Sequence, residues 1–161
     1  MKKVVILSLL AISCLSVQLQ GQVQAPAWQE ADSDSSLVVN FLKGNVFLIN
    51  GEQSVRDLPW NPHPSFKGVA LKHLLLGKDS ENQVSCHIVR IEPGCMLDTH
   101  IHDGKAEIHE VVAGSGKMYL DGREIEYSVG TLCLIPANTK HKVVAGKNGM
   151  YLFAKFLPAL Q

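Results

Sequence analysis

The sequence predicts an all-β domain, built as a sandwich or a barrel of short strands. From residue 69 to residue 156, short apolar runs follow one another and are separated by turn-forming residues such as glycine, proline and aspartate. No segment of the chain repeats its apolar residues at a convincing helical spacing. Hydrophobic residues make up 46% of the 161 residues and charged residues 19%, which is ordinary for a globular domain with a buried core.

The chain begins with features of a secretory signal peptide. Lys2 and Lys3 precede an apolar run at 4–17, which is too short for a bilayer span of about 20 residues. We expect cleavage after Gly21, so that residues 1–21 are removed on export. The segment therefore predicts a periplasmic or extracellular protein with no membrane span.

Two further features of the N-terminal region bear on its processing and on where the domain begins. Residues 11–14 resemble a lipoprotein box, so lipid anchoring through Cys14 is the alternative route of processing. Residues 22–36 are small, polar and acidic, which is typical of a flexible linker. A single domain is then expected over 37–161.

The strands of this domain can be placed in order. Residues 37–50 contain two apolar runs with Lys43-Gly44-Asn45 between them, which indicates a hairpin. The proline-rich stretch 57–64 cannot form a central strand. Asp121-Gly122 indicates a two-residue hairpin turn. Further strands are expected at 69–76, 84–91, 107–113, 117–120, 123–127, 131–135, 142–145 and 150–156.

Charge excludes one class of partner. The formal net charge is zero, and no basic cluster follows the opening lysines, whereas a nucleic-acid-binding protein normally carries a basic patch that neutralises phosphates. Nor does the sequence contain a nucleophile elbow, a phosphate-binding glycine-rich loop or a Cys-x-x-Cys pair. The expected partner is a small molecule.

A histidine pair is the most informative local feature. His100 and His102 are one residue apart, so on an extended strand their side chains point to the same face and can converge on one cation. Asp103-Gly104 allows the chain to turn and bring Glu107 back toward the same point. His141 offers a further imidazole later in the chain.

These residues lie in two spaced motifs, at 94–114 and 130–145. The first reads Gly, five residues, His-x-His, four residues, Glu, six residues, Gly; the second reads Gly, five residues, Pro-x-Asn, two residues, His, three residues, Ala. Both resemble the paired motifs of the cupin superfamily. Asn138 stands where that family has a second glycine, a mild change because asparagine tolerates left-handed backbone. Ala145 stands where the family has asparagine, which puts a supporting hydrogen bond in doubt.

The resemblance implies a fold and a metal. The expected fold is the cupin double-stranded β-helix, a jelly-roll barrel with a metal ion inside. By the family's pattern the metal ligands are His100, His102, Glu107 and His141. Three imidazoles and one carboxylate suit one divalent transition-metal ion, Fe(II), Mn(II), Zn(II), Ni(II) or Cu(II), and suit Ca(II) or Mg(II) poorly. An octahedral ion held in this way keeps two positions for water or substrate.

Strand alternation adds a neighbour to the site. If Glu107 points inward, so do His109 and Val111, and His109 becomes the candidate catalytic acid or base. The alternative is a core histidine bonded to a backbone carbonyl. Arg90 is either a ligand for an anionic substrate at the barrel mouth or a solvated strand residue.

Two functions remain open at this point. The first is an exported metalloenzyme with oxygenase, isomerase or lyase chemistry at the open positions of the metal. The second is a non-catalytic cupin that binds a small ligand or a metal. By analogy the protein is expected to be a homodimer. The sequence leaves open the metal, the substrate and any pairing among Cys86, Cys95 and Cys133.

Overall fold

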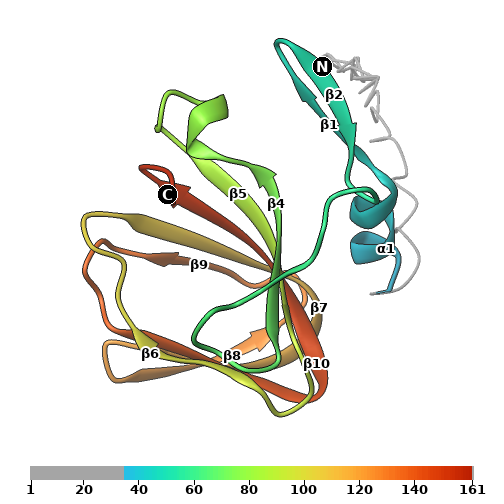
Figure 1. The fold of residues 1–161 in the computed structure, drawn as a ribbon. Helices are drawn as coiled ribbons and strands as arrows, with labels where there is room; N and C mark the ends of the chain where they lie inside the picture. The colour runs from blue at the N-terminus through green and yellow to red at the C-terminus, as the bar shows by residue number, and fades with distance from the viewer. Residues whose placement is uncertain (1–34, 161) are drawn as a thin grey trace, which may run out of the picture. The chain divides into compact units, whose positions relative to one another are not determined.

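The computed structural model describes residues 35–160, so the predicted signal peptide, Cys14 and nearly all of the predicted linker lie outside the described residues. No helix in 35–160 is long and apolar enough to span a membrane. Strands dominate this part of the chain (Figure 1). The elements are α1 (Ser35–Lys43), β1 (Asn45–Leu48), β2 (Gly51–Ser54), β3 (Asn61–Pro62), β4 (Val69–Leu75), η1 (Gly77–Asp79), β5 (Ser85–Ile91), β6 (Met96–His100), β7 (Ala106–Leu120), β8 (Arg123–Ser128), β9 (Leu132–Ile135) and β10 (His141–Leu157).

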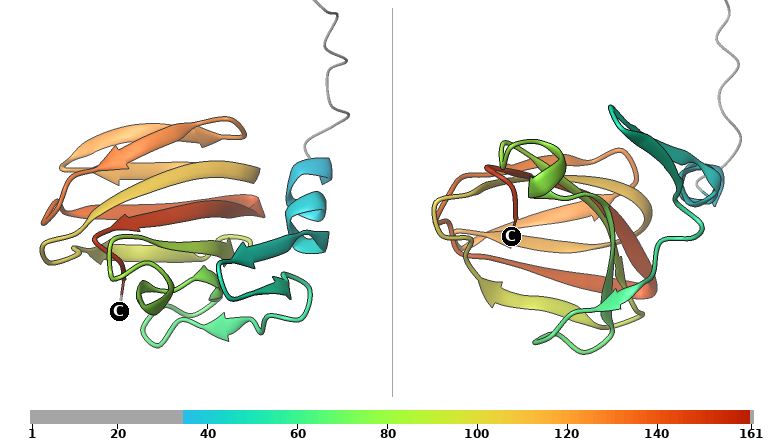
Figure 2. Two further views of the ribbon diagram at one scale, coloured as in Figure 1. Left: turned by 90° about the horizontal axis from the view of Figure 1, so that it is seen from above. Right: turned by 45° about the horizontal axis from the view of Figure 1, so that its top comes forward.

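Two long strands, β7 and β10, pair with each other and join the two halves of the barrel. The first part of β10 pairs with β6 and its later part pairs with β5. Likewise, the first part of β7 pairs with β9 and its later part pairs with β8. The strands therefore curl around a common interior, as Figure 2 shows, and the expectation of a β-rich jelly roll is confirmed.

The lengths of β7 and β10 correct the sequence prediction, which divided each of them into two strands. Gly114 was expected to end a strand, but it bends a continuous one. Its φ is +73°, and a Cβ there would lie 2.1 Å from the carbonyl oxygen of Gly149 on β10. The glycines allow two backbones to approach closely while the strands pass from one half of the barrel to the other.

The segment 37–50 also differs from the prediction, because α1 occupies its first part and the expected hairpin turn is displaced. Val38, Phe41 and Leu42 follow helical spacing and turn toward the core. The helix ends where the N–H of Gly44 donates to the carbonyl of Phe41. The hairpin follows as β1 and β2, with Ile49 and Asn50 at its turn. The domain is therefore mostly, but not entirely, β.

Two apolar cores result from this arrangement. The inner core fills the barrel with fully buried side chains such as Met118, Val143 and Leu152. The outer core lies between the N-terminal elements and the outer face of the sheet, where Phe41 packs on Phe153 with ring centroids 5.3 Å apart. Alternation along β4 and β5 sends successive side chains to one core or the other.

Candidate metal centre

The histidine pair lies at the end of β6. His100 is the last residue of the strand and His102 follows in the turn. The turn is held to the second motif by Asn138, whose Oδ1 accepts from Gly104 N at 3.0 Å and whose N–H donates to His102 O at 3.1 Å. Asn138 has φ +61°, so the left-handed backbone expected at this position is confirmed.

His141 approaches the pair from β10. It is paired in register with His100 across the ladder between β6 and β10. One ring nitrogen from each of His100, His102 and His141 lies within 4.8 Å of the others, so these three residues could hold a metal ion. Two segments that are distant in sequence, the end of β6 with the turn after it and the start of β10, thus place three imidazoles around one point.

Glu107 lies on β7 beside the histidines. Its Oε2 is 3.2 Å from His102 Nε2 and 3.2 Å from His141 Nε2. The carboxylate is buried, as is His109, whereas Ile108 between them is only partly buried. The predicted inward alternation along this strand is therefore confirmed.

Hydrogen bonds fix the protonation of two of the rings. His100 Nδ1 lies 2.6 Å from Asp98 O and His141 Nδ1 lies 2.9 Å from Thr139 O. Because a carbonyl oxygen can only accept, each Nδ1 carries the proton, and the Nε2 of a neutral ring then presents its lone pair to the centre. Burial lowers the pKa of His100 to about 4, which favours its neutral, coordinating form.

His109 holds Glu107 in place. Its Nε2 is 2.7 Å from Glu107 Oε1, and its Nδ1 is 3.3 Å from the hydroxyl of Tyr127. One carboxylate oxygen is thus engaged by His109, which leaves Oε2 for the centre. His109 is 1% exposed and both of its ring nitrogens have partners, so it resembles an orienting residue more than a free acid or base.

The centre attracts positive charge. Burial alone would raise the pKa of Glu107, but His109 and the two neighbouring ring nitrogens of His102 and His141 hold it well below its usual value. Glu107 Oε2 and His141 Nε2 are both buried and, although 3.2 Å apart, lack a hydrogen bond of acceptable geometry. Two acceptors this close need a cation or a proton between them, and the donor set of imidazoles and one carboxylate fits a divalent transition metal.

The four candidate ligands differ in how far they are buried. The side chains of Glu107 and His141 are 5% and 1% exposed, whereas that of His102 is 18% exposed. Phe66 packs against His100 with ring centroids 5.4 Å apart, and His63 stacks on Phe66 at 4.5 Å. His63 therefore lies one aromatic ring away from His100, although its proline-rich surroundings in the sequence give no sign of this.

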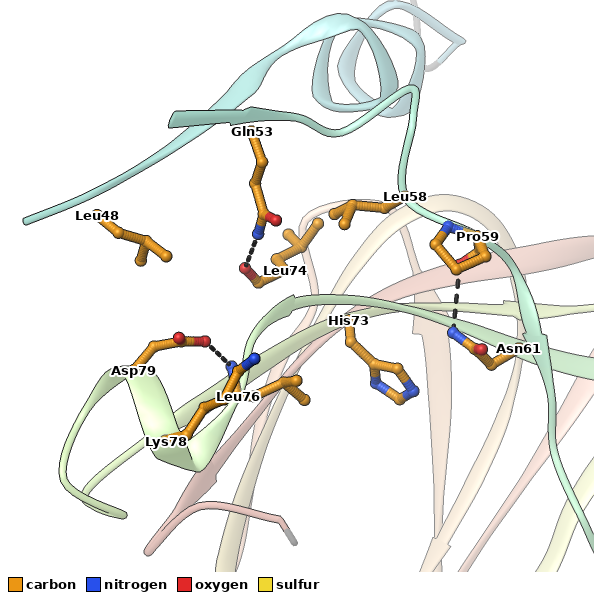
Figure 3. Close-up of a pocket in the computed structure, with 10 residues that line it drawn as sticks. All are labelled: Leu48, Gln53, Leu58, Pro59, Asn61, His73, Leu74, Leu76, Lys78 and Asp79. Atoms are coloured by element: carbon orange, nitrogen blue, oxygen red, sulfur yellow. Dashed lines mark hydrogen bonds between the residues drawn. The ribbon is translucent and has the colours of Figure 1, made fainter. Parts of the chain in front are cut away.

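A separate cavity of about 330 Å³ lies between the β1–β2 hairpin and the end of β4 (Figure 3). None of the four predicted ligands lines it. His73 does, and its Nδ1 lies 2.9 Å from Nδ1 of His87, a buried residue whose Nε2 is 3.0 Å from Ser85 Oγ. Burial and the neighbouring His73 lower the pKa of His87 to about 4, so this pair is neutral.

Other candidates lie away from the centre. Arg90 turns to the outer core, where its guanidinium stacks over Trp60 at 4.8 Å, so it is neither a mouth residue nor fully solvated. Cys133 is buried in the inner core, as its apolar run indicates. Cys86, Cys95 and Cys133 are free thiols in the structure.

Comparisons with known proteins agree with this fold. Residues 87–153 match the family model described as the cupin domain. An oxalate-binding protein from Thermotoga maritima is 24% identical over 76 residues, which are 47% of this chain and 63% of the relative. The chain thus spans somewhat less than two thirds of that relative's length.

Solved structures show the same fold. KdgF from Halomonas sp. aligns with a TM-score of 0.59 and 22% identity, over 71% of this chain and 94% of the other. An RmlC-like cupin from Shewanella frigidimarina aligns with a TM-score of 0.57 and 18% identity, over 66% of this chain and 88% of the other. At these identities the likeness concerns the fold alone.

Proposed function

Residues 87–153 belong to a cupin domain, and from this premise we propose that the protein is a metal-binding cupin that acts on a small organic molecule. In this proposal His100, His102, Glu107 and His141 hold one divalent transition-metal ion. The observation that carries it is the buried, unpartnered pair Glu107 Oε2 and His141 Nε2, directed at the same point as two further imidazoles.

Each residue would have a defined task. His109 orients Glu107, and the carbonyls of Asp98 and Thr139 orient two rings. Phe156 lies 4.8 Å from the His102 ring and keeps water from the inner side of the centre. A bound ion would supply a Lewis acid with positions left for substrate oxygen atoms. Oxygenase, isomerase or lyase chemistry is compatible with such a site.

Metal analysis of the untagged full-length protein tests the site. We expect about one equivalent of a divalent transition metal in the wild type and a loss of most of it in His100→Ala. His73→Ala is the matched control, since it removes an imidazole outside the centre and should keep the metal. Circular dichroism reports whether each variant is folded. Equal metal content in folded His100→Ala and wild type would end the proposal.

The alternative is a binding protein without turnover, and the double engagement of His109 favours it, because no free acid or base remains at that position. Oxygen uptake by the Fe(II)-loaded protein over a panel of diols, keto acids and catechols separates the two. Turnover of any of them supports an enzyme. Silence over the panel with ligand binding in calorimetry supports the binding protein.

Export and assembly are further parts of the proposal. We propose a periplasmic or extracellular protein, and mass spectrometry of the mature N-terminus tests this, since an acylated Cys14 would indicate the lipoprotein instead. We also propose a homodimer by analogy, which light scattering of the mature chain tests.

A further inference from the structure

A pocket on the outer side of the barrel carries an excess of positive charge. It has a volume of about 320 Å³ and is formed by α1, the loop that joins β2 to β3, and β4. Three of its six lining residues are cationic and none is acidic, whereas the whole chain has as many acidic as basic residues. The six are Val39, Leu42, Lys43, Arg56, Trp60 and Lys72. The fold therefore gathers cations that are far apart in the sequence.

Lys72 is the buried cation of this pocket, with 4% of its surface exposed. Its Nζ donates to Val55 O at 2.7 Å and to Arg56 O at 3.1 Å, so one of the three ammonium hydrogens is left over. Within residues 35–160 Lys72 forms no ion pair. Burial lowers its pKa, and the more distant Asp57 offsets this only in part. Because a buried charge without a counter-ion is costly, an anion beside it would be stabilised.

A further cation shares the tryptophan of this pocket. The guanidinium of Arg90 lies 4.8 Å from the centre of the Trp60 ring, and Lys72 Nζ lies 5.6 Å from it. Arg90 Nε is buried and has no hydrogen-bond partner. The face of an aromatic ring carries only a partial negative charge, so Trp60 does not neutralise two cations. The positive field of this region is thus left uncompensated by the part of the chain that the structure describes.

The remaining lining residues suit a ligand that is charged at one end and apolar at the other. Lys43 and Arg56 are exposed, and neither forms an ion pair with a described residue, so both are free to approach an anion. Val39 and Leu42 of α1 supply an apolar wall beside them. An apolar wall with a few convergent polar groups is the usual composition of a small-molecule site.

We propose that this pocket binds a small organic anion, with its acidic group among Lys43, Arg56 and Lys72 and its apolar body against Val39 and Leu42. None of the four proposed metal ligands lines the pocket, so the inference does not depend on the metal. All six lining residues also precede residues 87–153, so the pocket lies outside the segment that matches the cupin domain.

Calorimetry on the full-length chain, freed of metal by dialysis against a chelator, tests the pocket. Naphthalene-2-sulfonate is the probe, naphthalene-2-sulfonamide is its neutral match, and inorganic sulfate is an anion without an apolar body. The wild type should bind the sulfonate at least about tenfold more tightly than either of the others, because only the sulfonate uses both the cations and the apolar wall.

Two pairs of variants place the binding. Lys43→Gln/Arg56→Gln removes the two exposed cations and should weaken sulfonate binding about tenfold or more. Arg123→Gln/Lys147→Gln is the matched control, since it removes one exposed arginine and one exposed lysine outside the pocket, and it should bind as the wild type does.

The second pair changes the apolar wall. Val39→Glu places a carboxylate one helical turn from Lys43 and should weaken sulfonate binding about tenfold or more relative to Val39→Gln, which has the same shape without the charge. Val39 is 40% exposed, so neither change buries a polar group, and circular dichroism checks the fold of every variant.

The inference would be overturned by a wild type that does not bind the sulfonate, or that binds the sulfonamide or sulfate as tightly. Wild-type affinity in folded Lys43→Gln/Arg56→Gln, or equal affinities in Val39→Glu and Val39→Gln, would overturn it as well. Each of these results would leave the metal site standing, because the titrations are made without metal.

Discussion

At the scale of single residues, the carboxylate of Glu107 has its two oxygens in different roles. Oε1 accepts from His109 at 2.7 Å, and Oε2 faces two imidazole nitrogens at 3.2 Å. A carboxylate fixed in this way does not need to be ordered when a metal binds, so less conformational entropy is lost. The buried Tyr127 hydroxyl, 3.3 Å from His109, supports the same chain of contacts from the other side.

His109→Leu should therefore weaken metal binding although His109 is not a ligand. We expect a loss of about 10–100-fold in Zn(II) affinity, because Glu107 becomes free to rotate away from the centre. Competition with a chromogenic chelator measures it. Tyr127→Phe, which removes only the more distant contact, should cost less. Wild-type affinity in folded His109→Leu would show that Glu107 is held by other contacts.

The buried His87, whose Nδ1 lies 2.9 Å from Nδ1 of His73, predicts loss of stability in acid. The pKa of His87 is lowered to about 4, so between pH 6.5 and about pH 4 the unfolded chain binds a proton that the folded chain does not. Over this window the free energy of unfolding should fall as pH falls, by up to about 3 kcal/mol from His87 alone.

Urea unfolding across this pH window, with a metal chelator present, measures the effect. Other groups, including His73 and His100, contribute to the total slope, so the comparison with His87→Gln isolates one residue. The slope should be smaller in the variant. Identical slopes in the two proteins would mean that His87 does not titrate in this way.

At the scale of elements, the bends in β7 and β10 are where two backbones meet. A Cβ on Gly114 would lie 2.1 Å from Gly149 O, and one on Gly116 would lie 2.2 Å from Val144 O. Such contacts cannot be relieved by a side-chain rotation, because the backbone fixes the position of the Cβ and the atom it meets is a backbone oxygen of the paired strand. The bend thus depends on the absence of side chains at these positions.

Gly114→Ala should cost roughly 3 kcal/mol or more of stability, through the clash and the positive φ together. Gly94→Ala is a matched control, since Gly94 has φ +68° with nothing within 4 Å of the added Cβ. Gly94→Ala should lower the free energy of unfolding only through the strain of alanine at positive φ, by about 1–2 kcal/mol. Chemical denaturation measures both, and equal losses would show that close approach is not the reason for glycine at 114.

The elements also show what sequence patterns can and cannot predict. The strands β4, β5, β8 and β9 lie close to their predicted bounds, because each is a short run bounded by turn residues. The helix α1 was not predicted, since its adjacent β-branched residues Val38 and Val39 resemble a strand more than a short helix. A glycine within an apolar run can mark either the end of a strand or a bend in a continuous strand. The glycines of β7 and β10 therefore did not reveal that these strands continue.

At the scale of the whole molecule, the spaced motifs indicate which residues meet, but not what surrounds them. The grouping of His100, His102 and His141 follows from the motifs because β6 and β10 pair in register. His63 comes near His100 only through its packing on Phe66, which no local pattern records. The contact of Arg90 with Trp60 likewise depends on a loop folding over the outer face of the sheet.

The proposed ligands belong to β6, the turn after it, β7 and β10, so a bound metal would cross-link strands from both halves of the barrel. Unfolding separates these segments, and metal that binds only the folded state therefore stabilises it. At a free metal concentration 100 times the Kd, the gain is about 2.7 kcal/mol. For a domain of this size we expect a rise in Tm of roughly 5–10 °C.

Differential scanning fluorimetry with Zn(II), Mn(II) and Ni(II), each followed by excess chelator, measures the rise and its reversal. His141→Ala should show neither, and an equal rise in that variant would place the metal elsewhere on the chain.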